Sequence, residues 1–381
     1  MPLIIDCDPG NGIPGANVDD ALALCLAWSS PQLDLASVWT VFGNVSAAEG
    51  AQAAHRLAQT FGVSTPILTG CDAPLDTYVS RGAWRDKMET PRRAPDVERL
   101  WQGEEHSAQG ESAQQDASDP CESAQEVAAR LAHDVMSHVH GGPVTIAALG
   151  PLTDIGALIR FEPEAARHVA EIRMMGGCQG YDDLVDTNFA IDPLAASIVF
   201  ASGIDLTVVP LDVTRTTQLS RERWEQVRQR AGDLPEQRER AEAIDAWLSP
   251  WIEYSTRTRP VDGMWVHDMV VIAQMLCPEV VEEEAGRFML ARDPRGKLLE
   301  ACDGGWREGP RGDEEFLAKP RQVNMVTAVD NDRLLTLWTN VVLGVQSHCA
   351  WLLTGTTRYD IFRRNKSGAR RIGPHFRVTS G

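Results

Sequence analysis

The sequence predicts an α/β fold, a single large domain with a mostly parallel central sheet flanked by helices, as in Rossmann-like cores. Strand and helix signals alternate along the chain, and several apolar strands end in Gly or Pro before a helix begins. Parallel strands are usually buried on both faces and joined by helices, so this alternation indicates a parallel sheet. Residues 1–345 show no change of composition that would mark a linker between two cores.

The elements follow one another in a regular order. The first strand is the apolar run Leu3-Ile4-Ile5, and Pro9-Gly10 forces a turn soon after it. A helix is expected from Asp19 to Trp28, stopped by Ser29-Ser30-Pro31. Further strands are expected at residues 35–42, 65–68, 144–149, 171–175 and 206–211, and further helices at 47–61, 122–138, 165–169, 240–256 and 269–276.

The composition restricts the partners of the protein. Its 381 residues carry a net charge of −18, which argues against binding to nucleic acid or to an anionic membrane surface. No apolar run could span a bilayer and no signal pattern opens the chain, so we expect a cytoplasmic location. The eight cysteines are scattered without a C-x-x-C pair, which indicates reduced thiols and no zinc site.

Two segments differ from the rest. Residues 76–121 are polar and repeat Ser-Ala-Gln, which fits either a lid over the site or an insertion without function. Residues 346–381 form a basic C-terminal extension, which fits either a contact with a neighbouring subunit or a solvated tail.

Four carboxylates gather where the first strand ends. Asp6 and Asp8 point to the same side of the strand because its side-chain period is two. Asp19 and Asp20 open the next helix, where the helix dipole favours acidic residues. Ligands of open α/β sheets bind at this edge, and crowded carboxylates suit a hard divalent cation. The alternative is that Asp19 and Asp20 only cap the helix and the others are solvated.

Other polar groups follow later strands. Asn44 follows the second strand, and the backbone carbonyl of Leu149 at the end of another could bind a hard cation. Asp186 and Asn188, two residues apart, could hold vicinal hydroxyl groups. Each of these sites also fits an ordinary turn.

His267 and Asp268 precede an apolar helix. Asp268 could be a further carboxylate ligand at the helix terminus. His267 could transfer protons near neutral pH, although a lone buried histidine is more often structural.

Together these motifs resemble the inosine-uridine-preferring nucleoside hydrolase family, whose signature is Asp-x-Asp-Pro-Gly-x-Asp-Asp-Ala. The resemblance covers residues 1 to about 345. The matching blocks occur in the family's order and are Asp6–Gly10 with Asp19–Ala21, Gly43-Asn44, Leu149–Thr153, Met174–Gly177, Asn188 with Ile191–Pro193, Leu211–Thr214 and His267-Asp268.

The resemblance implies hydrolysis of ribonucleosides to ribose and free base with a bound Ca²⁺, in nucleoside metabolism such as purine salvage. It implies calcium ligands at Asp8, Asp20, Asp268 and the Leu149 carbonyl, with Asp8 also the general base. His267 would lie at the leaving base. The ribose would be held by Asp19, Asn44, the backbone of Met175, Asp186 and Asn188. We expect a homodimer or homotetramer.

The sequence departs from the family pattern in three places. Eight residues, Asn11 to Val18, stand where the family has one, and we expect this loop to order over the site. Asp186 replaces a glutamate, so its carboxylate is one methylene shorter. The family's His-Gly block is not recognisable in residues 76–121.

The resemblance also implies a base pocket near the helix at 240–256, where the family's helix with base-contacting aromatic residues falls. Trp247 and Trp251 lie one turn apart on one face of it. We assign Trp247 to the core and expect Trp251 to have a partly open face that stacks on the base. If Trp251 is core, the aromatic contact is to be sought at Tyr254, Trp265 or in the lid.

Two other functions fit parts of the pattern. A haloacid-dehalogenase-type phosphatase also opens with an apolar strand and Asp-x-Asp, but Pro9-Gly10 and His267-Asp268 fit that family poorly. A non-catalytic nucleoside- or ribose-binding protein could keep the fold without turnover.

Overall fold

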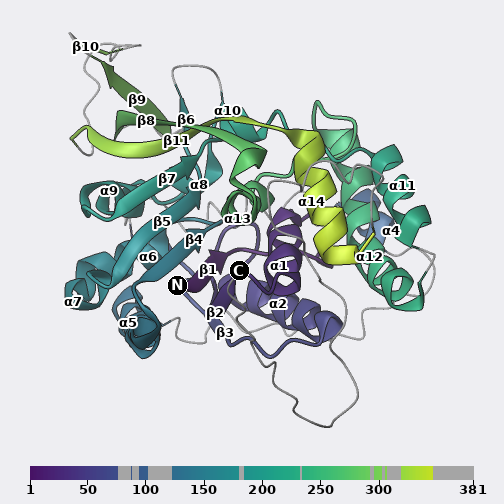
Figure 1. Cartoon of the computed structure of the whole chain (residues 1–381), viewed down its shortest axis with the longest axis horizontal. Coiled ribbons are helices and arrows are strands. Elements are labelled where there is room, and N and C mark those ends of the chain that lie inside the picture. Colours follow the sequence, from purple (N-terminus) through teal and green to yellow (C-terminus); the bar gives the residue numbers. More distant parts are fainter. Residues whose placement is uncertain are drawn as a thin grey trace, which may run out of the picture. The chain divides into compact units, whose positions relative to one another are not determined.

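In the computed structural model, the central sheet orders its strands β10-β9-β8-β11-β7-β5-β4-β1-β2-β3, with β6 paired to β9 (Figure 1). Neighbours from β3 to β11 run parallel, and the pairs among β11, β8, β9 and β10 run antiparallel. The predicted mostly parallel sheet is therefore confirmed. Its strands are β1 (Pro2–Cys7), β2 (Asp34–Thr40), β3 (Ile67–Thr69), β4 (Val144–Ala148), β5 (Val169–Met175), β6 (Cys178–Gln179), β7 (Asp205–Val209), β8 (Val281–Leu290), β9 (Lys297–Cys302), β10 (Gly305–Trp306) and β11 (Arg321–Val329).

The structure describes residues 1–75, 87, 94–101, 122–179, 184–231, 234–291, 296–302, 305–306 and 319–345. Most of the expected lid at 76–121 and all of the basic extension at 346–381 lie outside these residues. None of the described helices is long and apolar enough to cross a membrane. The helices are α1 (Asp19–Ser29), α2 (Ala47–Phe61), α4 (Pro95–Trp101), α5 (Ala124–His138), α6 (Thr153–Phe161), α7 (Pro163–Ala166), α8 (Thr187–Ala190), α9 (Pro193–Ala201), α10 (Leu211–Thr214), α11 (Arg221–Ala231), α12 (Pro235–Thr258), α13 (Met269–Leu276) and α14 (Asn331–Leu343).

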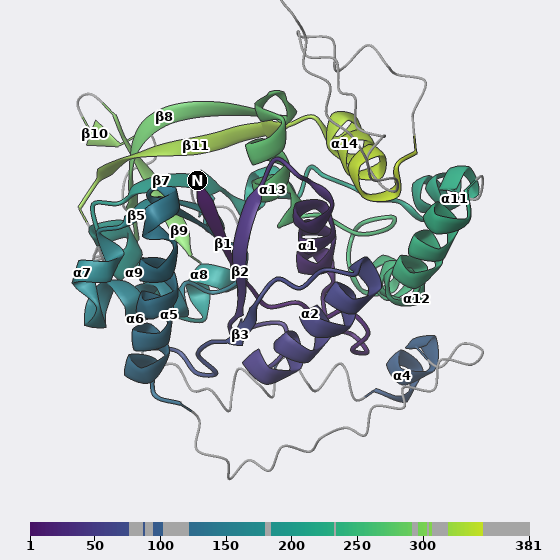
Figure 2. The same ribbon diagram turned by 60° about the horizontal axis from the view of Figure 1, so that its bottom comes forward.

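Helices cover both faces of the sheet, as the first strand illustrates. Leu3 and Ile5 of β1 belong to a core cluster that also contains residues of α1, α12, α13 and α14. Ile4, which lies between them, belongs to a second cluster with residues of α5, α6 and α9. Successive side chains of a strand point to opposite faces, so a fully apolar strand is what a sheet covered on both sides requires. Figure 2 shows the two sets of helices on either side of the strands.

The order of the strands creates a switch point between β1 and β4. The chain moves from β1 outward through β2 to β3, and then returns to place β4 on the other side of β1. β1 pairs with both neighbours in parallel, so the three strands end at the same edge of the sheet. Crevices at such switch points are where open α/β sheets bind ligands.

Some predicted boundaries are wrong. The helix expected at 165–169 is α7, which begins at Pro163 and ends at Ala166. Val169 instead begins β5, because it pairs with Val144 of β4. The helix expected at 240–256 is longer and contains Pro250 in its interior. The sequence interpretation also missed the antiparallel strands β8 and β11 and the helix α14, which lie after the last predicted helix.

Candidate active site

Asp8 lies at the switch point, one residue beyond the end of β1. Its carboxylate accepts a hydrogen bond of 2.6 Å from the backbone N–H of Asn44, which follows β2. The Asn44 side chain also donates to Asp20 Oδ2 at 3.3 Å. Gly43 leaves the space for this contact, because a Cβ atom there would lie 1.9 Å from Asp8 Oδ2. The Gly43-Asn44 turn therefore packs closely against Asp8 and also contacts Asp20.

Asp19 and Asp20 are the first two residues of α1 and are both buried. The long loop before them does not displace them, because the Gly10 N–H donates to the Asn17 carbonyl at 3.0 Å and closes the loop. Gly12 and Gly15 both have positive φ, at 81° and 71°, which glycine adopts without steric cost. The side chain of Asn11 holds the loop on α2 through the Ala53 carbonyl. The longer loop therefore still leaves Asp19 and Asp20 at the start of α1, close to Asp8.

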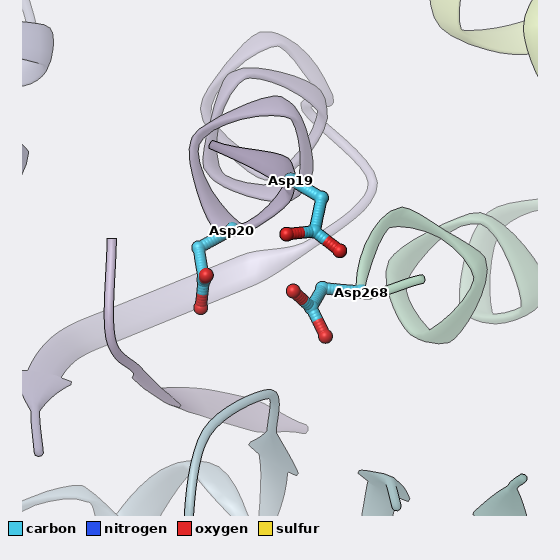
Figure 3. Close-up of side chains that lie close together, drawn as sticks. All are labelled: Asp19, Asp20 and Asp268. Atoms are coloured by element: carbon cyan, nitrogen blue, oxygen red, sulfur yellow. The ribbon is translucent and has the colours of Figure 1, made fainter. Parts of the chain in front are cut away.

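Asp268 completes an acidic cluster with Asp19 and Asp20 (Figure 3). One carboxylate oxygen of each lies within 4.8 Å of the others, and all three residues are buried. Asp268 immediately precedes α13, so both helices present carboxylates from their N-termini, where the helix dipole stabilises negative charge.

The electrostatics show a group of buried carboxylates that repel one another. Burial, together with the charge of Asp20, raises the pKa of Asp8 well above its ordinary value. Burial and the charge of Asp19 raise the pKa of Asp20 to about 7 and that of Asp268 well above its usual range. Asp19 Oδ1 is buried and has no hydrogen-bond partner in the described part of the chain. Buried oxygen ligands that repel one another fit a hard divalent cation such as Ca²⁺.

The acidic cluster differs in one member from the predicted calcium ligands. Asp19, which we expected on the ribose, shares the cluster with Asp20 and Asp268. Asp8 adjoins it, because its backbone N–H donates to Asp20 Oδ1 at 3.0 Å. The Leu149 carbonyl follows β4 and accepts a bond of 2.7 Å from Asn188 Nδ2, which leaves its second lone pair for another partner.

Two of the predicted ribose residues, Asn188 and Asp186, have different surroundings. Asn188 donates both to the Leu149 carbonyl and, at 3.1 Å, to the Met175 carbonyl, so it connects the ends of β4 and β5. Asp186 instead caps α8 by accepting from the Phe189 N–H at 2.9 Å. Burial raises the pKa of Asp186 to about 6. Its carboxylate therefore already has a structural partner, which the sequence did not indicate.

His267 is held on two sides. Its backbone N–H donates to Asp19 Oδ2 at 3.1 Å, and its Nδ1 lies 2.7 Å from the hydroxyl of Thr214. Burial lowers the pKa of His267 to about 4, although the charge of Asp19 opposes this shift. The imidazole is therefore neutral at pH 7, and its Nε2 atom is the ring nitrogen not bound to Thr214.

The partly open face that we expected for Trp251 is wrong. The side chain is 1% exposed and packs in the larger core cluster. The Arg259 guanidinium lies 4.6 Å from the ring centre, and Tyr254 packs against the ring at 5.4 Å. The expectation overlooked Arg259, whose guanidinium stacks on the indole. Trp247 is buried, as expected.

The sequence interpretation assigned no role to three residues near His267, namely Thr214, Arg215 and Arg259. The block Leu211–Thr214 marks a strand end, but only the fold brings Thr214 to the imidazole. Tyr254 also contacts Trp101 of α4, at 6.1 Å between ring centres. The described part of the expected lid thus packs beside α12 (Figure 2).

An acidic site at the switch point of a parallel sheet defines this chain as a ligand-binding α/β protein. The model of the inosine-uridine preferring nucleoside hydrolase family matches residues 3–336, and the chain belongs to this family. The family prediction and the enzyme class, hydrolysis of ribonucleosides to ribose and base, are confirmed.

Similar proteins agree with this assignment. The non-specific ribonucleoside hydrolase RihC of Escherichia fergusonii is 30% identical over 74% of this chain and 80% of its own length. The pyrimidine-specific ribonucleoside hydrolase RihA of Klebsiella pneumoniae is also 30% identical, over 74% of this chain and 81% of its own. The purine-preferring ribonucleoside hydrolase of Gardnerella vaginalis shares the fold, with a TM-score of 0.63 and 21% identity over 91% of this chain and 99% of that one.

Proposed function

We propose that this chain hydrolyses the N-glycosidic bond of ribonucleosides in a calcium-dependent reaction at the acidic cluster. The observation that carries the proposal is the burial of Asp19, Asp20 and Asp268 against one another at the switch point, with Asp8 beside them. A cluster with so many raised carboxyl pKa values is stabilised by a bound cation. The absence of a neighbouring Cys or His ligand in the described cluster favours calcium over zinc.

We assign the residues of the site to three roles, which are calcium binding, proton transfer and ribose binding. We assign Asp8, Asp20, Asp268 and the Leu149 carbonyl to calcium, with Asp19 at the boundary between calcium and ribose. When bound, calcium would orient the ribose hydroxyls and lower the pKa of water. Asp8 then accepts the proton of the attacking water as general base. Asn188, Asn44 and the backbone of Met175 hold the ribose; the contact of Asp186 with ribose stays a prediction.

The two faces of the sugar need different chemistry. As the C–N bond breaks, positive charge develops on the ribose ring, as in other glycoside hydrolyses. The carboxylates lie where they can stabilise that charge. His267 lies where the base departs. Because its pKa is low, we assign it the role of a neutral hydrogen-bonding group.

The decisive experiment measures ribose release and metal content together. Purified protein is assayed for reducing sugar with inosine, xanthosine, adenosine, uridine and cytidine, before and after chelation and after return of Ca²⁺ or Zn²⁺. We expect stoichiometric calcium, and turnover that chelation abolishes and calcium restores. Nucleoside binding without turnover would instead support the non-catalytic alternative. Stoichiometric zinc, or full activity without divalent metal, would contradict the proposed site.

The comparisons with relatives do not decide between purine and pyrimidine nucleosides, because relatives of both preferences resemble the chain. The same assay panel establishes the preference. The homodimer or homotetramer and the cytoplasmic location stay predictions, and measurement of the mass in solution tests the oligomer.

A further inference from the structure

Two arginines beside His267 stack on tryptophans in the same way. Arg215 is the C-cap residue of α10, and its guanidinium lies 4.5 Å from the ring centre of Trp265. Arg259 is the C-cap residue of α12 and lies 4.6 Å from the ring centre of Trp251. Both side chains belong to half-buried residues. Neither guanidinium has a hydrogen-bond or ion-pair partner within the described part of the chain.

Arg215 and Arg259 come from separate helices, α10 and α12, and both lie near His267. The ring centres of Trp265 and His267 are 6.0 Å apart, so the Arg215–Trp265 stack adjoins the imidazole. The charge of Asp19 acts on Arg259, which places this guanidinium near the acidic end of the site. The charges of both Arg215 and Arg259 act on His267, so the two guanidinium groups lie in the surroundings of the imidazole. The position assigned to the departing base therefore has two nearby guanidinium groups.

Two other half-buried arginines of this chain also stack on aromatic rings, but they have acceptors. Arg130 lies over Trp39 and also donates to the Thr69 carbonyl. Arg240 lies over Phe61 and also donates to the Val342 carbonyl at 2.8 Å. These half-buried guanidiniums have acceptors, as groups removed from water require. The comparison identifies Arg215 and Arg259 as half-buried donors that lack an acceptor among the residues that the structure describes.

Stacking uses the face of a guanidinium and leaves the N–H groups of its edge free. Such edges bind planar anions with directed, charge-assisted hydrogen bonds. A nucleobase that leaves with the electrons of the C–N bond is a planar anion, and its charge spreads onto ring nitrogens and carbonyl oxygens. The free donors and this charge are complementary, and they interact most strongly after the bond has begun to break.

We propose that Arg215 and Arg259 stabilise the negative charge of the departing base and make the rate depend on how well a base carries that charge. The inference rests on the proposed ribonucleoside hydrolysis. The C1′–N bond breaks and its electron pair goes to the base, while the water oxygen bonds to C1′ and its proton goes to Asp8. The guanidiniums donate hydrogen bonds to the base without losing a proton, and solvent protonates the released base.

The first test compares two leaving groups in Arg215→Gln and Arg259→Gln. Inosine needs stabilisation of its base, whereas p-nitrophenyl ribofuranoside releases a phenolate that is already a stable anion. We expect kcat/KM for inosine to fall about tenfold to hundredfold in each variant, the scale of a lost transition-state donor, and less than about threefold for the phenyl riboside. Equal losses on both substrates, or no loss on inosine, would overturn the proposal.

Arg160→Gln is the matched control. Arg160 also stacks on an aromatic ring, at 5.4 Å from the centre of Phe161, but lies at the C-terminal end of α6. We expect kcat/KM for both substrates to stay within about twofold of the parent, as for most surface substitutions away from a site. Melting temperatures of all variants identify any that fold poorly, and the ratio of the two substrates is independent of the folded fraction.

A binding experiment tests the same idea without turnover. In calorimetric titrations of the calcium-loaded protein with free bases at pH 8, xanthine is largely anionic and hypoxanthine largely neutral. We expect xanthine to bind more tightly, with the difference lost in Arg215→Gln and Arg259→Gln. Equal binding by the parent overturns the proposal. A parent that releases ribose from no nucleoside refutes the proposed function instead, so the two failures are distinguishable.

Discussion

Asp6 and Asp154 are buried carboxylates outside the acidic cluster, and the charge of Asp154 acts on Asp6. Asp154→Asn should make the protein more stable. Asp154 is fully buried on α6 and Asp6 is 2% exposed. Asp154 Oδ1 accepts from the Cys71 N–H at 2.7 Å. Its other oxygen and both oxygens of Asp6 lack a donor in the described chain. An asparagine can keep the bond to Cys71, and it removes the negative charge that acts on Asp6.

The pKa of Asp154 gives the magnitude. Burial raises it to about 6, from an ordinary value of 3.8. This difference of about 2 pH units corresponds to about 3 kcal/mol, at about 1.4 kcal/mol per unit. Because the folded-state pKa is the higher one, the contribution of Asp154 is fully present below pH 3.8 and is lost as the pH rises through 6. Asparagine does not titrate, so the variant avoids this loss.

Urea denaturation at pH 5 and pH 8 measures the effect, with equal calcium in all samples. We expect Asp154→Asn to gain about 1–3 kcal/mol in the free energy of unfolding at pH 8 and clearly less at pH 5. Asp34→Asn, at an exposed carboxylate that begins β2, is the control and should change stability by less than about 0.5 kcal/mol at both pH values. A destabilised variant at pH 8, or a gain that is the same at both pH values, would refute the reasoning.

Three further predictions concern the site and its surroundings. Asp8→Asn should lower kcat by several orders of magnitude with the fold intact, because a general base is lost from a metal site, and turnover within tenfold of the parent would remove Asp8 from this role. Shortening the loop Asn11–Val18 to one residue should change KM more than calcium content, because the bond between Gly10 and Asn17 already brings the loop ends together; unchanged kinetics would make the loop a bystander. Trp251→Ala should destabilise the fold by about 3–5 kcal/mol, as for other buried aromatic truncations, and an unchanged melting temperature would contradict its place in the core.

The sheet and the acidic end of the site could be predicted because they depend on local signals. The strand Leu3–Ile5 must be buried on both faces, and the turn at Pro9-Gly10 fixes where its carboxylates lie. Strand ends of a parallel sheet meet at one edge, so Asp8, Asn44 and Leu149 were expected together. The long loop Asn11–Val18 does not change this arrangement, because a longer loop adds little entropic cost once its ends are held together.

The antiparallel end of the sheet was harder to predict. β8 begins with seven exposed or half-exposed residues, and β11 alternates between buried and exposed ones over much of its length, so neither is a continuous apolar run. The two strands pair with each other over nearly their whole length, which no local pattern of either segment reveals. The capping role of Asp186 was not predicted for a similar reason, since it depends on the backbone that follows this residue.

The base end of the site depends on contacts between distant segments, and there the partly open face expected for Trp251 was wrong. Thr214 meets His267 across 53 positions of the chain. Arg259 stacks on Trp251 because α12 ends at Thr258, seven residues after Trp251. An indole on a helix face looks the same in sequence whether a base or a guanidinium stacks on it. The difference has chemical consequences: a tryptophan alone offers a base a stacking surface, whereas an arginine held on a tryptophan offers it hydrogen bonds and positive charge. The Arg259–Trp251 stack thus leads us to expect a pocket that selects bases by their capacity to carry negative charge.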